Sequence, residues 1–168
     1  MKIPAATLAY WTTRGFPPAT PLEIAELEAL AGQALPADLI GFLRTHGFVE
    51  WDIDIPDTFD YRLGQSGQTV VKSAYVGRMA SLHSLRDFVR YGRAENPSLG
   101  LPQFPPTYWP VVRTPGQDVV LTELGPSAGR IWYWPERADP WGTGDNTELG
   151  FVADSFTAFI EGLRLGSD

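Results

Sequence analysis

Apolar residues recur with the period of a helix near the start of the chain. Residues 20–32 read TPLEIAELEALAG, with apolar positions three and four residues apart at Ile24, Leu27, Leu30 and Ala31. This spacing places them on one face of a helix. Thr20 and Glu23 have the spacing of a capping box, and Pro21 suits the first helical position. The pattern predicts a helix from about residue 21 to Gly32, which tolerates a left-handed backbone.

A second helix is predicted directly after the first. It follows Leu35-Pro36, and Gly47 marks its end. Its apolar face is formed by Leu39, Ile40 and Leu43. Asp38 lies near the N-terminal end, where the helix dipole stabilises a carboxylate. The chain therefore opens with two short helices joined by a tight connection.

Short strands are predicted for much of the remaining chain. Apolar and β-branched runs separated by glycine and proline occur at Trp51–Ile55, Thr69–Val71, Ala74–Met79, Trp109–Arg113, Asp118–Thr122 and Arg130–Trp134. Such runs are typical of short antiparallel strands. Gly125-Pro126 and Gly129 separate the last two runs, which we expect to form a hairpin.

Two further helices are predicted, one in the middle of the chain and one at its C-terminal end. Ser81 or Ser84 caps the first, whose inner face is Leu82, Leu85, Phe88 and Val89. The second follows a cap at Asp154, and its apolar positions are Phe156, Phe159, Ile160 and Leu163. Helices at both ends with consecutive strands between them predict an α+β fold, an antiparallel β-sheet with helices packed on it. No second domain boundary is visible, so residues 1–168 are expected to form one domain.

Composition excludes several classes of function. The chain has a net charge of −7, which argues against a general nucleic-acid binder, because phosphate contacts require a basic face. It has no cysteine, so disulfides, thiolate metal sites and cysteine nucleophiles are absent. No apolar run has the length of about 20 residues that a membrane helix needs, and the N-terminus lacks the features of a secretory signal. We expect a cytoplasmic protein that contacts no membrane.

No motif for catalysis or cofactor binding is present. A nucleophile elbow and a phosphate-binding loop are both missing, and Gly142-Thr143-Gly144 has no other part of a dinucleotide fingerprint. His46 and His83 have neither metal-ligand nor triad spacing. His46 falls in the last turn of the second helix, where the negative end of the helix dipole stabilises a partly charged imidazole. Arg86, Arg90 and Arg93 share one helix face, as solvated residues commonly do. The sequence predicts no catalytic residue, no metal and no cofactor.

An acidic ridge is the first candidate binding surface. Its residues are Glu50, Asp52, Asp54, Asp57 and Asp60. If Trp51–Ile55 is a strand, alternate acids share one face. A calcium loop would need a glycine and a closing glutamate, and a glycosidase pair would need a sugar-binding site, neither of which the sequence indicates. Two interpretations remain open: a solvated strand face, or a negative surface that steers a basic protein partner.

Trp141 is the second candidate. It lies in Pro135–Leu149, a long segment with two prolines and two glycines. Long loops in compact domains are uncommon unless they bind something. Trp141 is therefore either tucked under the loop as an anchor or offered to a partner.

The helical start resembles the SUKH superfamily, which contains the yeast cell-wall-assembly regulator of the Smi/Knr type and many bacterial proteins. The residues that carry the resemblance are Pro21, Ile24, Leu27, Glu28, Gly32, Leu35-Pro36, Asp38, Phe42-Leu43 and Gly47. Later matches are Trp109–Val111, Gly129–Tyr133, Val152–Phe156 and Phe159-Ile160. The similarity runs from about residue 20 to about residue 164. It departs at His46-Gly47-Phe48, where many members have a polar residue and two glycines.

The resemblance implies a binding function. Bacterial members of the superfamily are similar to immunity proteins, each of which neutralises a cognate secreted toxin by binding it. The first hypothesis is therefore a non-enzymatic immunity protein whose partner is a protein, with a basic secreted toxin as the specific expectation. The alternative is a regulatory or scaffold protein of the cell-wall-assembly type with no link to a toxin. A hydrolase that uses the acidic ridge is a third hypothesis.

Overall fold

A computed structural model describes residues 1–54, 57–65, 67–94, 98–116, 118–126, 128–135 and 137–165, without the side chain of Gln65. The helices are α1 (Ala5–Arg14), α2 (Pro21–Ala31), α3 (Ala37–His46), α4 (Leu82–Gly92) and α5 (Phe156–Glu161). The strands are β1 (Asp57–Gln65), β2 (Gln68–Tyr75), β3 (Arg78–Met79), β4 (Tyr108–Arg113), β5 (Val119–Glu123), β6 (Ile131–Trp134), β7 (Gly150–Ala153) and β8 (Arg164–Leu165).

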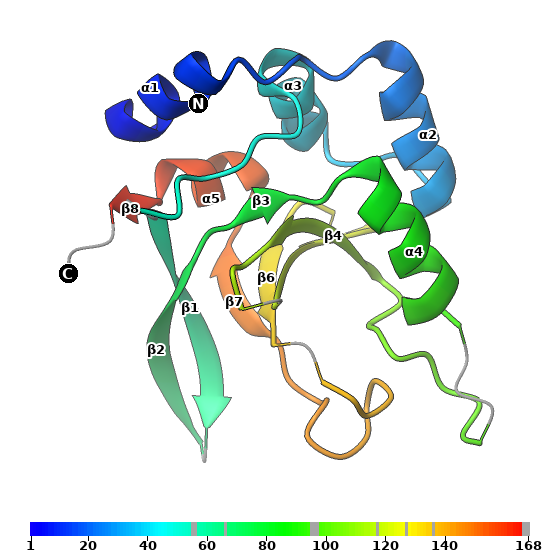
Figure 1. Cartoon of the computed structure of the whole chain (residues 1–168). Coiled ribbons are helices and arrows are strands. Elements are labelled where there is room, and N and C mark those ends of the chain that lie inside the picture. Colours follow the sequence, from blue (N-terminus) through cyan, green and yellow to red (C-terminus); the bar gives the residue numbers. More distant parts are fainter. Residues whose placement is uncertain are drawn as a thin grey trace.

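The described strands form one curled antiparallel sheet with helices packed on it (Figure 1). Its strand order is β2-β1-β7-β6-β5-β4-β3, and β8 pairs with β1. Helices α1, α2 and α3 lie along one side of the molecule, and α4 lies against the strands near β4 (Figure 1). The hairpin of β1 and β2 projects from the rest of the sheet. The predicted α+β architecture is confirmed, as is the hairpin of β5 and β6.

The first two predicted helices form as their sequences indicate. In α2, Thr20 Oγ1 accepts a hydrogen bond from the Glu23 N–H at 3.2 Å, and Glu23 Oε2 accepts one from the Thr20 N–H at 2.7 Å. Asp38 in α3 does more than meet the helix dipole. Its Oδ2 accepts a hydrogen bond from the Thr157 N–H at 2.8 Å, which joins α3 to the start of α5. A residue in the first turn of α3 thus also fixes a long-range helix contact.

The predicted strand Trp51–Ile55 is wrong for the residues that the structure describes there. Trp51 donates its backbone N–H to the Gly77 carbonyl at 2.7 Å, and the chain then bends. The bend occurs because Asp52 Oδ1 accepts a hydrogen bond from the Asp54 N–H at 3.0 Å, in competition with strand pairing. Ile55 lies outside the described residues. Regular pairing starts only at Asp57, in a strand that the pattern did not predict.

The C-terminal helix is present but begins later than predicted. Ser155, not Asp154, caps it, because the Ser155 hydroxyl accepts a hydrogen bond from the Ala158 N–H at 3.0 Å. Val152 and Ala153 belong to β7, which precedes the helix. The predicted apolar positions are nevertheless all buried, namely Phe156, Phe159, Ile160 and Leu163.

Helix α1 was not predicted. Trp11 holds it to the rest of the molecule by donating its indole N–H to the Glu50 carbonyl at 3.0 Å. The same ring lies edge-on to Phe42 and Trp51, with ring centroids 5.5 and 5.3 Å away. Its burial explains why so short a helix is stable, since packing contributes more than propensity. None of the helices in the described part of the chain has the length and apolar character needed to cross a membrane.

Candidate functional site

The acids of the predicted ridge do not form one exposed surface. Asp57 is only 2% exposed, and its Oδ2 accepts a hydrogen bond from the Thr7 hydroxyl of α1. Burial raises the pKa of this carboxyl, and the Thr7 hydrogen bond opposes the rise. Asp57 therefore cannot contribute to a surface that meets a partner. The Asp60 carboxylate is paired with Arg164 and accepts a hydrogen bond from the Ser73 hydroxyl at 2.6 Å.

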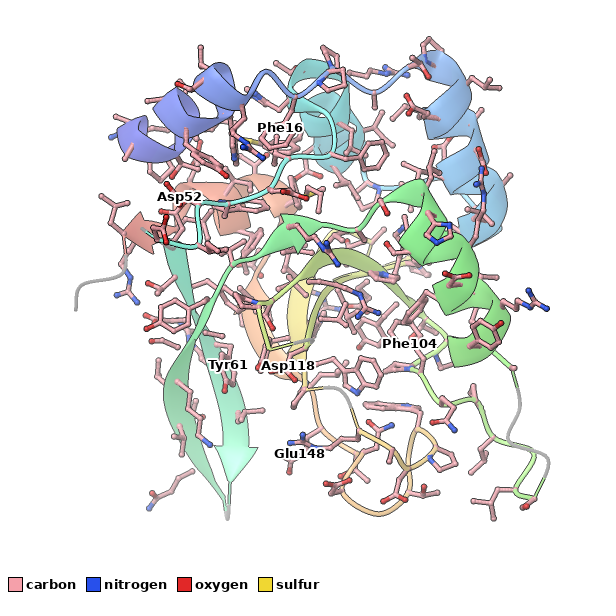
Figure 2. All side chains as sticks on the ribbon, in the orientation of Figure 1. Phe16, Asp52, Tyr61, Phe104, Asp118 and Glu148 are labelled. Atoms are coloured by element: carbon pink, nitrogen blue, oxygen red, sulfur yellow. The ribbon has the colours of Figure 1, made fainter. Side chains whose placement is uncertain are left out.

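The other three acids lie on the segment that connects α3 to β1. Glu50 and Asp52 are half-buried and Asp54 is exposed. Figure 2 shows Asp52 at the level of α5 and β8, at the end of the molecule opposite Glu148. Between Asp52 and Asp54, Ile53 exposes 77% of its surface. The three remaining acids thus lie on one short segment that also carries an exposed apolar residue.

Trp141 packs beneath its own loop. Its side chain is half-buried against an aromatic and aliphatic cluster that includes Phe104 and Trp134, and its backbone N–H donates to the Pro102 carbonyl at 2.8 Å. Buried Asn146 holds the loop in place: its Nδ2 donates to the Gln103 and Asp139 carbonyls at 3.0 and 2.8 Å, and its Oδ1 accepts from the Trp134 indole at 2.8 Å. This is the geometry of the tucked alternative. Contact between Trp141 and a partner stays a prediction.

The two histidines lie beside other side chains of the protein. The His46 ring lies 5.0 Å from the Phe42 ring and 5.6 Å from the Trp11 ring, between centroids. Burial lowers the pKa of His46, which favours neutral imidazole in this aromatic setting. His83 is exposed and lies 3.5 Å from a carboxylate oxygen of Asp87.

The two arginines of α4 and Arg93, directly after it, are each engaged within the protein. Arg86 pairs with Glu26 of α2, and Arg90 lies over the Tyr91 ring at 5.3 Å. Arg93 lies over the Trp109 ring at 5.3 Å, where burial lowers its pKa. Arg86 and Arg93 thereby join this part of the chain to α2 and β4, whereas Arg90 contacts a residue of its own helix.

A groove lies between α4 and the strands that carry Arg78, Arg113 and Trp134. We call it the arginine groove; its volume is about 510 Å³. Its lining residues are Arg78, Ser84, Asp87, Phe88, Tyr91, Gly92, Gln103, Phe104, Arg113, Trp134 and Arg137. Figure 2 shows Phe104 below α4, where it forms the floor with Trp134 at a ring distance of 5.2 Å. Aromatic rings and three arginines thus share one concave surface.

A smaller hollow of about 220 Å³ adjoins this groove. Its lining residues are Glu50, Trp51, Ile53, Gly77, Arg78, Arg113, Thr114 and Pro115. We call it the small hollow. Arg78 and Arg113 line both spaces, because they are paired residues in the register of β3 and β4. The acidic segment that contains Glu50 and Ile53 therefore forms one wall of a site whose other wall is basic.

Two buried polar atoms of residues that line the small hollow have no hydrogen-bond partner among the described residues. They are the indole N–H nitrogen of Trp51 and the hydroxyl oxygen of Thr114. Buried polar groups are nearly always paired in folded proteins, so an unpaired pair beside one hollow is informative. Sequence reasoning found Glu50 but missed the arginines. They are far apart in the sequence, and only the register of β3 and β4 brings Arg78 beside Arg113.

The arginine groove and the small hollow together form the candidate site. Its lining supplies hydrogen-bond donors, positive charge and aromatic surface. Within the described ranges, no group of three or more histidine, cysteine or acidic side chains is placed to hold a metal ion. Arg137 is the third arginine of the groove, and it pairs with Asp145 of the loop at 3.3 Å.

Comparison with known proteins places the chain in a family. A search of the curated proteins finds no match. The model of the SMI1 / KNR4 family (SUKH-1) matches residues 18–162, which is most of the chain and contains α2 through α5 with all the strands except β8. The resemblance carried by the two N-terminal helices is thereby confirmed, and the chain belongs to the SMI1 / KNR4 family (SUKH-1).

Proposed function

We propose that this chain is a non-enzymatic protein-binding module that acts as an immunity protein, neutralising a cognate bacterial toxin by direct binding. Membership of the SUKH family supports a binding role. The arginine groove with the small hollow is the surface on which the toxin binds. When the toxin is bound at this surface, this chain covers the active site of the toxin or the access to it.

The composition of the arginine groove is the observation that carries the proposal. Tryptophan, tyrosine and arginine are the residue types that contribute most to binding energy at protein interfaces. Trp134, Tyr91 and three arginines line this one surface. Tyr91 is 63% exposed in the free protein, so a partner can bury a large part of an aromatic side chain there.

Net charge supports a basic toxin as the partner. At −7, the chain attracts a cationic protein at long range, which raises the association rate. Asp54 and the half-buried Asp52 add negative charge beside the small hollow, on the segment that also carries Ile53. The long-range attraction and the short-range contacts at the arginine groove contribute separately to toxin binding, and the charges that cause them can have opposite signs.

The direct test uses the toxin domains encoded beside this gene. Each is expressed in a bacterial host with and without this chain, and growth is measured. We expect this chain to restore growth against one toxin domain and to form a stable complex with it in size-exclusion chromatography. Restored growth without a complex, or growth that this chain restores against none of the neighbouring toxin domains, would contradict the proposal and favour the regulatory scaffold.

Two matched pairs of variants place the interface. Tyr91→Ala removes an exposed tyrosine at the arginine groove, and Tyr75→Ala removes one on β2, at the other edge of the sheet. Arg78→Gln and the equally exposed Arg62→Gln form the second pair. We expect Tyr91→Ala to weaken toxin binding by roughly 2 kcal/mol and Tyr75→Ala to leave it unchanged. The reverse result would move the interface to the β1–β2 hairpin.

A further inference from the structure

We propose that the small hollow binds a carboxylate, supplied by an aspartate or glutamate side chain of the protein partner. That the carboxylate comes from a protein rests on the proposed function, whereas the carboxylate-binding property rests on the residues of the hollow alone. Three side chains carry it: Arg78, Trp51 and Thr114. The inference names the chemistry that this part of the surface recognises.

Arg78 provides the positive charge, and Arg113 lies beside it. Their Cα atoms are partners in the antiparallel ladder of β3 and β4, so their side chains leave the same face of the sheet. Arg78 is exposed, and its side chain makes no hydrogen bond or ion pair with any described residue. An arginine binds a carboxylate through two parallel hydrogen bonds, which makes a guanidinium on this wall a strong receptor.

Gly77 fixes the position of Arg78. A Cβ atom at residue 77 would lie 2.4 Å from the carbonyl oxygen of Arg113, so the backbones approach as closely as they can. The Gly77 carbonyl also accepts the Trp51 N–H. The strand that presents Arg78 is therefore held between the Trp51 segment and β4. A preorganised wall of this kind reduces the entropic cost of binding.

The unpaired groups of Trp51 and Thr114 point to an acceptor. The Trp51 indole can only donate a hydrogen bond, and the Thr114 hydroxyl can donate one. Both residues are buried and both line the hollow. Leaving such a group unpaired costs about 1–3 kcal/mol, so a ligand oxygen that accepts from either donor recovers part of this energy on binding. These two donors and the guanidinium group of Arg78 match the two oxygens of a carboxylate.

Glu50 sets the charge of the ligand. Glu50 lines the hollow together with Arg78, which carries a single positive charge and has no side-chain partner among the described residues. A monoanionic carboxylate matches this charge, whereas a phosphate dianion would leave excess negative charge beside Glu50. Ile53 at the rim supplies apolar surface for the methylene groups of an acidic side chain.

The test measures carboxylate binding without any toxin. The full chain is titrated with the blocked peptide acetyl-Gly-Glu-Gly-amide, and in parallel with the glutamine peptide acetyl-Gly-Gln-Gly-amide, in two-dimensional ¹H–¹⁵N NMR. The assigned indole N–H resonance of Trp51 is the reporter. We expect a saturable shift of this resonance with the glutamate peptide and a clearly smaller one with the glutamine peptide.

Variants assign the binding to the named side chains. Arg78→Gln should weaken glutamate-peptide binding about tenfold or more, because it removes a charged hydrogen-bond donor. Thr114→Val preserves the shape of a threonine and should also weaken binding. Arg62→Gln makes the same change of charge on β1 and should leave binding unchanged. An equal response to both peptides, or unaltered binding by Arg78→Gln, would overturn the inference.

The outcome is separable from that of the toxin experiment. Glutamate-peptide binding without neutralisation of any toxin would refute the proposed function and retain the carboxylate site. Neutralisation of a toxin without carboxylate binding would retain the proposed function and refute the carboxylate site.

Discussion

At the scale of single residues, two buried polar side chains hold peripheral segments to the core. Asp57 receives the Thr7 hydroxyl of α1, while its Oδ1 has no hydrogen-bond partner among the described residues. Asn146 uses both of its amide atoms to anchor the loop that carries Trp141. The first is an incompletely paired acid and the second a fully engaged amide. Their substitutions should therefore behave differently.

Asp57 should make stability depend on pH. Burial raises its pKa above the ordinary value of 3.8, so the folded protein binds this proton more tightly than the unfolded chain does. The contribution of Asp57 to stability is therefore lost as pH rises through the raised pKa and regained as pH falls towards 3.8. We expect the free energy of unfolding of the wild type, minus that of Asp57→Asn, to increase as the pH is lowered. Urea denaturation between neutral pH and pH 4 measures it, and a constant difference would contradict it.

Asn146 should be costly to replace. In Asn146→Ala the Trp134 indole and the carbonyls of Gln103 and Asp139 lose their partner, at about 1–3 kcal/mol for each group that stays buried. We expect the free energy of unfolding to fall by at least about 2 kcal/mol. The control is Thr147→Ala, at the exposed neighbouring position, which should change stability by no more than about 0.5 kcal/mol. Equal effects of the two substitutions would show that the loop is not anchored in this way.

At the scale of elements, locally specified segments were predictable and those that depend on distant partners were not. Thr20 and Glu23 specify the start of α2 from within the segment itself. In contrast, β7 was not predicted, because only pairing with β1 and β6 makes Val152 and Ala153 part of a strand. The bend at Asp52 likewise replaced a strand by a side-chain hydrogen bond. Apolar periodicity detects burial, but it does not identify the strand that a residue will pair with.

Helix α5 should be essential to the core despite its length. Phe159 is 2% exposed, and its ring meets that of Phe59 edge-on at 5.6 Å. Phe159→Ala should lower the free energy of unfolding by about 3–5 kcal/mol, because it leaves a cavity between α5 and β1. Thr157→Ala, at a half-buried position in the same helix, serves as the control. A loss below about 1 kcal/mol for Phe159→Ala would contradict this packing.

At the scale of the whole molecule, the sign of the net charge and the sign of the site differ. The chain carries −7 overall, yet arginines from β3, β4 and the loop after β6 converge on one groove. No stretch of sequence announces this convergence, because each arginine is isolated among residues of other kinds. The predicted acidic ridge is divided in the structure: Glu50 lines the small hollow, whereas Asp57 and Asp60 are engaged within the protein.

Binding kinetics should separate these two charges. With the cognate toxin, we expect Asp52→Asn combined with Asp54→Asn to slow association, and the effect to fade with added salt because the Debye length is about 8 Å at physiological ionic strength. Arg78→Gln should instead speed dissociation, as loss of a short-range contact does.

Trp141→Ala tests the remaining prediction: an unchanged dissociation rate would mean that Trp141 serves only its own loop. Surface plasmon resonance at two salt concentrations measures all three, and unchanged association of the aspartate double variant at low salt would exclude steering by that segment.

Helix α1 lies outside the stretch that matches the family, and this has a practical consequence for anyone who excises the domain. A fragment cut at residues 18 and 162 would lose Trp11, whose ring covers Trp51 and Phe42, and Leu163, which is buried beyond α5. The new ends would expose apolar surface, which promotes aggregation. Boundaries taken from sequence similarity therefore differ from the limits of the cooperative folding unit. Cloning and limited proteolysis should be planned on the latter.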